Sequence, residues 1–182
     1  ENPGVHVIYL QNALRDTVGS IPHGVNLPIY LAMGSIEAEI FDSLGLRCRD
    51  YYPVGSVKLG LALAQYKEQK SEFFDLCFIS HYRPELFSHN SPRLFRKIEE
   101  TQHRLFKNLI CYASTHDLSL VVTSKSRNAD LQDAEFSYFS SIAGEFKFQF
   151  TRGDKSAHEF DSYRVALSSD LIIHPASTLG FE

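Results

Sequence analysis

DLCFISHYR, residues 75–83, decides the fold expected of the second half of the chain. Its first five residues form a mostly apolar, strand-like run, and its last four are polar. Three further runs of this kind follow, and a helical pattern lies between each strand and the next. The later strands are predicted at 118–123, 146–150 and 170–174, and the helices from Ser91, at 130–141 and at 162–167. This alternation predicts an α/β fold, with a Rossmann-like parallel sheet and helices on both faces.

The first half of the chain carries a shorter version of the same alternation. Strand-like runs occur at 5–10, 27–33 and 51–54, and a short helix is predicted at 37–44, where Gly45 ends it. These pieces resemble the end of a βαβ domain. Residues 57–71 have a helical period and suit a connection between two domains.

We therefore expect three parts in the chain. They are the C-terminal part of an N-terminal Rossmann-like domain at 1–57, an interdomain linker at 58–72, and a second Rossmann-like domain at 73–182. The chain begins with Glu1, and its last residues have the pattern of a helix that has only begun. We expect a fragment of a longer protein, with the second domain truncated at its C-terminus.

The composition argues against several classes of function. The 18 Lys and Arg residues are balanced by 22 Asp and Glu, and like charges form no long block, so no nucleic-acid-binding arm is expected. Three cysteines without a C-x-x-C pair argue against a disulfide framework or a zinc site. No apolar run approaches the roughly 20 residues of a membrane span. A cytoplasmic protein is predicted.

Chemistry is expected where the strands of the second half end, because open parallel sheets bind ligands outside the carboxyl ends of their strands. Three such exits, at 80–83, 124–127 and 174–178, carry hydroxyl, imidazole or cationic groups and no carboxylate. Such an edge suits a phosphate or diphosphate. The candidate residues in the loops and at the strand ends are His81, Arg83, Lys125, Arg127 and His174.

The last of these exits is the most informative. Ser177 and Thr178 fall where a strand turns into a helix, and hydroxyls and free backbone N–H groups there can hold a phosphate at the positive end of the helix. Glu182 lies about one helical turn further on and could accept hydrogen bonds from a ribose. The alternative that Ser177 or Thr178 only caps the helix stays open.

Fewer residues in the first half suggest chemistry. Gln11, Asn12 and Arg15 follow a strand and are the candidates for binding an acceptor molecule. Asp16 or His23 could be the base that removes a proton from an acceptor hydroxyl. A turn or capping role for Asp16, and a surface position for His23, remain the alternatives.

Three stretches of the sequence resemble motifs of one enzyme class. Residues 170–173 followed by 177–182 resemble the donor-site motif of GT-B glycosyltransferases that build bacterial surface polysaccharides. Residues 9–15 are similar to the "QNGLR" strand exit, with Ala13 in place of the usual glycine, and residues 53–58 to the "GS-x-K" segment before the linker. The resemblance is greatest to the surface-carbohydrate-biosynthesis branch, and more distant to Kdo-, sialyl- and CDP-glycerol-type transferases.

This resemblance implies two facing Rossmann-like domains, with the nucleotide-activated sugar donor on the second and a glycan or glycolipid acceptor on the first. It implies that Ser177 and Thr178 hold the donor phosphate and that Glu182 binds the ribose. Arg83, Lys125 and Arg127 would stabilise the leaving group in place of a metal, and no D-x-D metal motif is visible. The His174-Pro175 pair is similar to the His-Pro motif of sialyltransferase-like enzymes, where it sits on an earlier strand exit.

The expected function is thus metal-independent transfer of a sugar to a cell-surface glycan, without a cofactor, at the inner face of the bacterial membrane. Peripheral association with that membrane through regions outside this sequence stays open. The alternatives are a CDP-glycerol- or ribitol-type phosphotransferase and a non-catalytic nucleotide-binding module. A sugar-nucleotide epimerase of the same architecture is disfavoured, because the strand exits carry few acidic residues.

Overall fold

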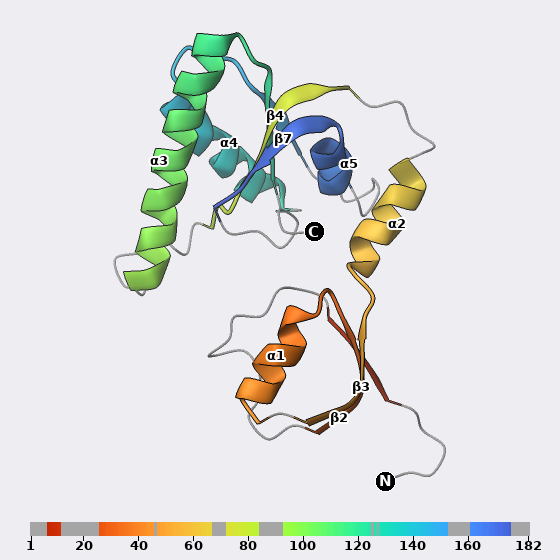
Figure 1. Ribbon diagram of the computed structural model, residues 1–182. Coiled ribbons are helices and arrows are strands. Elements are labelled where there is room, and N and C mark those ends of the chain that lie inside the picture. Colours follow the sequence, from red (N-terminus) through yellow and green to blue (C-terminus); the bar gives the residue numbers. More distant parts are fainter. Residues whose placement is uncertain are drawn as a thin grey trace. The chain divides into compact units, whose positions relative to one another are not determined.

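The computed structural model places two compact units along the chain, divided between Ala64 and Gln65. Each unit contains its own parallel β-sheet with helices beside it, which confirms the predicted α/β class (Figure 1). The residues that the structure describes are 7–11, 26–45, 47–66, 72–83, 93–124, 126, 128–152 and 161–175.

The first unit is built on a three-stranded parallel sheet in the order β1-β2-β3. Its elements are β1 (Ile8–Leu10), β2 (Asn26–Ala32), α1 (Ile36–Ser43), β3 (Arg47–Pro53) and α2 (Val57–Tyr66), the last of which crosses the division. Its core joins Leu27, Tyr30 and Ala32 of β2 to Phe41 of α1. The rings of Tyr30 and Phe41 meet edge to face with centroids 5.1 Å apart, so α1 is packed against the sheet through aromatic contact.

The second unit is built on a four-stranded parallel sheet in the order β6-β5-β4-β7. Its elements are β4 (Phe74–Ile79), α3 (Arg93–His116), β5 (Leu120–Thr123), α4 (Ala129–Ala143), β6 (Gln149–Thr151), α5 (Asp161–Leu167) and β7 (Ser169–Ile173). Because all strands run the same way, their carboxyl ends meet at one edge of the sheet.

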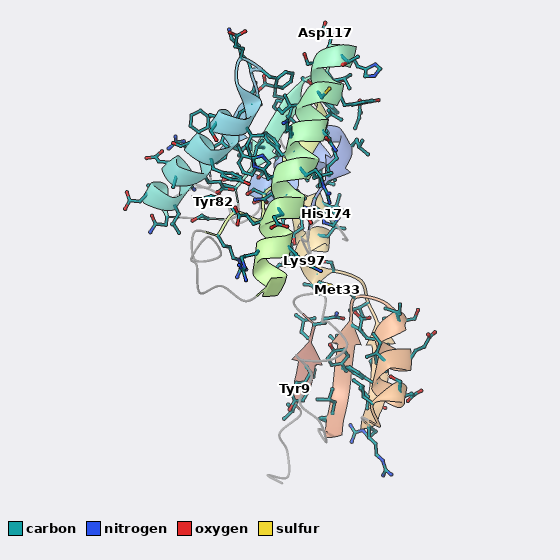
Figure 2. The ribbon with its side chains drawn as sticks, turned by 90° about the vertical axis from the view of Figure 1, so that its left-hand side faces the viewer. Tyr9, Met33, Tyr82, Lys97, Asp117 and His174 are labelled. Atoms are coloured by element: carbon teal, nitrogen blue, oxygen red, sulfur yellow. The ribbon has the colours of Figure 1, made fainter. Side chains whose placement is uncertain are left out.

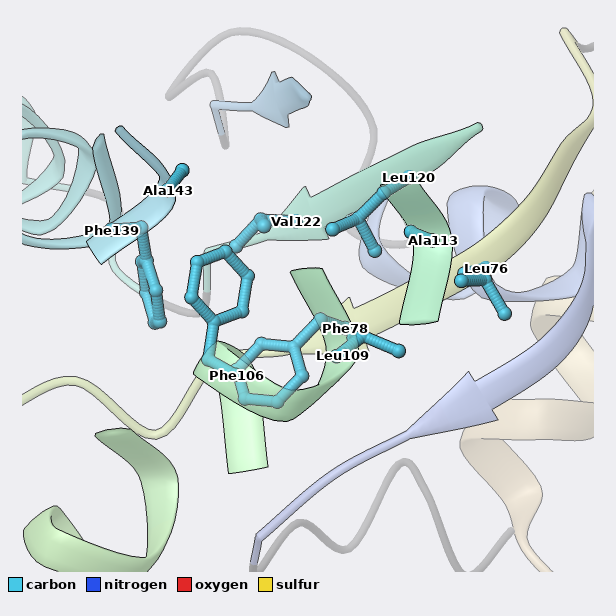
Figure 3. Packing of buried hydrophobic residues seen from close by; sticks show 9 residues of the cluster. All are labelled: Leu76, Phe78, Phe106, Leu109, Ala113, Leu120, Val122, Phe139 and Ala143. Atoms are coloured by element: carbon cyan, nitrogen blue, oxygen red, sulfur yellow. The ribbon is translucent and has the colours of Figure 1, made fainter. Parts of the chain in front are cut away.

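Helices cover both faces of the central strands β4 and β5 of this second sheet, as buried parallel strands require. On one face α3 and α4 pack over β4 and β5, and three fully buried rings form the centre of the cluster (Figure 3). These are Phe78, Phe106 and Phe139, whose centroids lie 4.6–5.6 Å apart. On the other face Val165 and Ala166 of α5 pack with Cys77 and Ile79.

The predicted strands are present with limits shifted by one to a few residues, most clearly at two of them, and the helix expected at the end of the chain lies outside the described residues. β3 begins at Arg47 rather than at residue 51, because Asn26 and Leu27 of β2 already pair with Arg47 and Cys48. β6 begins at Gln149 rather than at residue 146, because its ladder with β5 starts there, although Phe146 and Phe148 still pack against the core. Among the described helices, none is long and apolar enough to cross a membrane.

Candidate functional site

The candidate site is the carboxyl edge of the second sheet, at the pair β4 and β7. From β4 the chain moves through β5 to β6 on one side and then returns to place β7 on the other side of β4. A reversal of this kind leaves a crevice between the two strands where it occurs, and ligands of open α/β sheets bind there. Phe78 pairs with Ile173, so the following residues Ser80-His81 and His174 flank the reversal.

Two serines build the strand exits beside this point. Ser80 follows β4 and Ser124 follows β5, directly after the paired residues Ile79 and Thr123. The hydroxyl of Ser80 accepts a hydrogen bond from the backbone N–H of Tyr82 at 3.0 Å, and that of Ser124 accepts one from Ser126 at 3.1 Å. Both loops therefore turn in the same way, each organised by the first residue after its strand.

Both serines also meet one carboxylate. Ser124 Oγ donates to Glu135 Oε2 at 2.5 Å, and the hydroxyl of Ser80 is a second partner of the same glutamate. Glu135 comes from α4 and is 2% exposed. Burial raises the pKa of Glu135, while the hydrogen bonds from Ser124 and Ser80 act in the opposite direction. One buried glutamate thus fixes two neighbouring strand exits.

Two glutamines complete the support of these loops. Gln102 of α3 is buried and accepts the backbone N–H of His81 through Oε1 at 2.6 Å. Gln132 of α4 is buried and donates through Nε2 to the carbonyl of Ser126 at 2.6 Å. The backbone of each exit is therefore held by a side chain from the helix that packs beneath it.

The side chains around the site form an aromatic and cationic rim. The ring of Tyr82 packs at a tilt against that of Tyr138 of α4, with centroids 5.3 Å apart, and Arg83 is exposed. Arg96 and Lys97 are exposed on the first six residues of α3, where acidic residues are usual because the helix N-terminus is positive. Figure 2 shows Tyr82, Lys97 and His174 toward one end of the second unit and Asp117 at the other.

Sequence reasoning missed the residues that organise this edge. Gln132, Glu135, Phe139 and Ala143 are the buried residues of α4, and they recur at helical spacing. That spacing was visible in the sequence and could have marked Glu135 as facing the sheet. The basic residues at the start of α3 were also visible.

The first unit has a comparable arrangement at its own strand exits. Gln11, predicted to contact an acceptor, is 5% exposed, and its backbone N–H donates to the carbonyl of Leu31 at 2.9 Å. Its side-chain oxygen accepts the N–H of Met33 at 2.7 Å, and its amide nitrogen donates to Glu37 Oε1 at 2.6 Å. Gln11 thus connects β1 to the exit of β2 and to α1; contact with an acceptor stays a prediction.

Four of the predicted site residues lie within the described part of the chain. His81, Arg83 and His174 lie at the carboxyl edge of the second sheet and Gln11 at that of the first. The remaining candidates lie outside the described residues: Asn12, Arg15, Asp16, His23, Lys125, Arg127, Ser177, Thr178 and Glu182.

The fold and this edge define a Rossmann-like α/β protein, since the second sheet has the order 3-2-1-4 when its strands are counted along the unit. Comparisons with protein-family models, with curated proteins and with solved structures gave no match to the chain. Within the part of the chain that the structure describes, no group of three or more His, Cys, Asp or Glu side chains is arranged to hold a metal ion.

Proposed function

We propose that the protein is a GT-B-type glycosyltransferase that moves a sugar from a nucleotide-activated donor to a cell-surface glycan. The second unit would bind the donor nucleotide and the first unit the acceptor. The observation that carries the proposal is the reversal of strand order between β4 and β7, flanked by His81 and His174. The motif resemblance at both ends of the chain supports the same assignment.

The chemistry of the rim fits an anionic leaving group. When the bond between the anomeric carbon of the sugar and the donor phosphate breaks, negative charge grows on the departing phosphate and must be stabilised. Arg83 can form two parallel hydrogen bonds to phosphate oxygens, whereas Lys97 acts as a point charge. The N-terminus of α3 adds positive potential from the dipole of the helix. These groups supply the neutralisation from the protein itself.

Nucleotide titration tests this assignment. Binding of CMP, UDP and GDP to the 182-residue chain is measured by calorimetry, first for the wild type and then for Arg83→Gln and His174→Gln. Hydrogen bonds to a charged group are worth about 1.5–3 kcal/mol, so each variant is expected to bind at least about tenfold more weakly. His116→Gln is the matched control, because His116 ends α3 and is exposed.

Two results would count against the proposal. One is the absence of binding by all three nucleotides, and the other is unchanged affinity in both variants. Once a nucleotide binds, incubation with donors carrying it identifies the reaction. Release of nucleotide with sugar transfer supports a glycosyltransferase, and transfer of glycerol phosphate from CDP-glycerol supports the phosphotransferase instead.

A further inference from the structure

The first unit contains a buried carboxylate that is only half satisfied. Glu37 lies in the first turn of α1, just after the exit of β2, and is 3% exposed. Its Oε1 accepts the hydrogen bond from Gln11 Nε2 at 2.6 Å. Its Oε2 is buried and has no hydrogen-bond partner in the described part of the chain.

An unsatisfied carboxylate oxygen in this position is costly. Leaving a buried acceptor without a donor costs about 1–3 kcal/mol, and more when the group is charged. About 90% or more of buried polar groups in native proteins have a partner, so an exception calls for an explanation. Gln11 holds Glu37 in place while satisfying only one oxygen, which orients Oε2 without occupying it.

The surroundings of Oε2 suit a neutral donor. Tyr51 donates its hydroxyl to the carbonyl of Gly34 at 2.5 Å, and burial, with the nearby charge of Glu37, raises its pKa to about 12, so the phenol stays neutral. No ion pair to Glu37 occurs among the described residues. A single free acceptor oxygen matches one O–H group, whereas an ammonium ion has three donors to satisfy.

The residue beside this oxygen, at the exit of β2, is a glycine. Gly34 lies between β2 and α1, and a Cβ added there would stand 3.9 Å from Glu37 Oε2. The residue does not need glycine for its backbone, because its φ is not positive. Met33, beside it, marks the carboxyl end of β2 in Figure 2. The missing side chain therefore affects the space over Oε2 rather than the fold.

We infer that Glu37 Oε2 accepts a hydrogen bond from a hydroxyl of a polyhydroxylated ligand, a sugar or polyol, bound at the carboxyl edge of the first sheet. Identifying this ligand as the acceptor of the transfer reaction rests on the proposed function. The hydrogen bond itself does not, because it is inferred from the contacts of Gln11, Gly34 and Glu37 alone.

The test observes the carboxyl carbon of Glu37 directly. The 182-residue chain, with ¹³C-labelled glutamate, is titrated with glycerol and with the methyl glycosides of glucose, galactose and mannose, and Glu37→Gln assigns the resonance. We expect at least one probe to shift this resonance in a saturable manner. Gly34→Ala, which keeps the carboxylate and places a methyl group 3.9 Å from Oε2, should weaken that binding at least about fivefold.

The matched control is Glu39→Gln, because Glu39 lies on the same helix and is exposed. It should leave the affinity for the probe unchanged. The inference is overturned if no probe shifts the Glu37 resonance, or if Gly34→Ala binds as tightly as the wild type. Nucleotide titration of the same samples separates the two proposals. If a glycoside binds and no nucleotide does, the hydroxyl-binding site is supported and only the transferase assignment is contradicted.

Discussion

At the scale of single residues, Glu135 is the most informative side chain in the second unit. It lies 2% exposed between two serine hydroxyls, and burial raises its pKa above the ordinary glutamate value of 4.5. The folded state therefore binds a proton at this site more tightly than the unfolded chain does. The stability that the raised pKa of Glu135 contributes is fully present below pH 4.5 and is lost as the pH rises through the folded-state pKa.

Glu135→Gln removes this titration while keeping the shape of the side chain. We expect the free energy of unfolding of the wild type, relative to the variant, to fall as the pH rises above 4.5, by at most about 1.4 kcal/mol per pH unit. Urea unfolding at four pH values measures the difference. Glu145→Gln is the control, because Glu145 is exposed. A constant difference between wild type and Glu135→Gln would show that Glu135 has an ordinary pKa when folded.

At the scale of the elements, α4 depends on the capping residue before it as well as on its buried face. Asn128 caps the helix, and its side-chain oxygen accepts the backbone N–H groups of Asp130 and Leu131 at 2.9 and 3.3 Å. The N–H of Asn128 is itself bound by the hydroxyl of Ser126. The beginning of α4 and the exit of β5 therefore form one hydrogen-bonded turn.

Asn128→Ala should lower the free energy of unfolding by about 1 kcal/mol, because two backbone donors lose their acceptor. Ser137→Ala, on the exposed side of the same helix, removes only a bond to the carbonyl of Asp133 and should change stability by no more than about 0.5 kcal/mol. Chemical denaturation followed by circular dichroism compares the two. Equal losses would show that the cap contributes nothing specific.

At the scale of the whole molecule, the two units have separate cores. The cluster around Phe78, Phe106 and Phe139 lies in the second unit, and the cluster around Tyr30 and Phe41 lies in the first. A defect in one core should therefore reduce the stability of its own unit first. Local opening is governed by the contacts within each cooperative region.

Phe139→Ala should destabilise the second unit by about 3–5 kcal/mol, because the ring is fully buried against two others. Amide hydrogen exchange should show the loss in β4 and β5, while β2 keeps its protection. Phe136→Ala, three residues earlier and 39% exposed, should cost much less. Equal loss of protection in β2 would contradict the independence of the two cores.

The fold could be predicted because its signals are local, whereas much of the site could not. Apolar runs such as residues 75–79 indicate buried strands wherever they occur. The helical spacing of Glu135 with Phe139 and Ala143 could mark it as facing the sheet, but only the strand order brings Ser80 and Ser124 to it. Gln11 illustrates the reverse case: a polar residue after a strand suggested a ligand contact, yet both ends of its amide are used within the fold.

The shared glutamate beneath Ser80 and Ser124 has a consequence for redesign of the protein. Loop grafting after β4 or β5 treats each insertion as independent, yet here both loops start from residues tied to the same carboxylate. A grafted loop that lacks a hydroxyl at its first position would disturb the neighbouring loop as well as its own conformation. Swaps that retain that serine should be tolerated, and changes in ligand preference are best sought from the third loop residue onward.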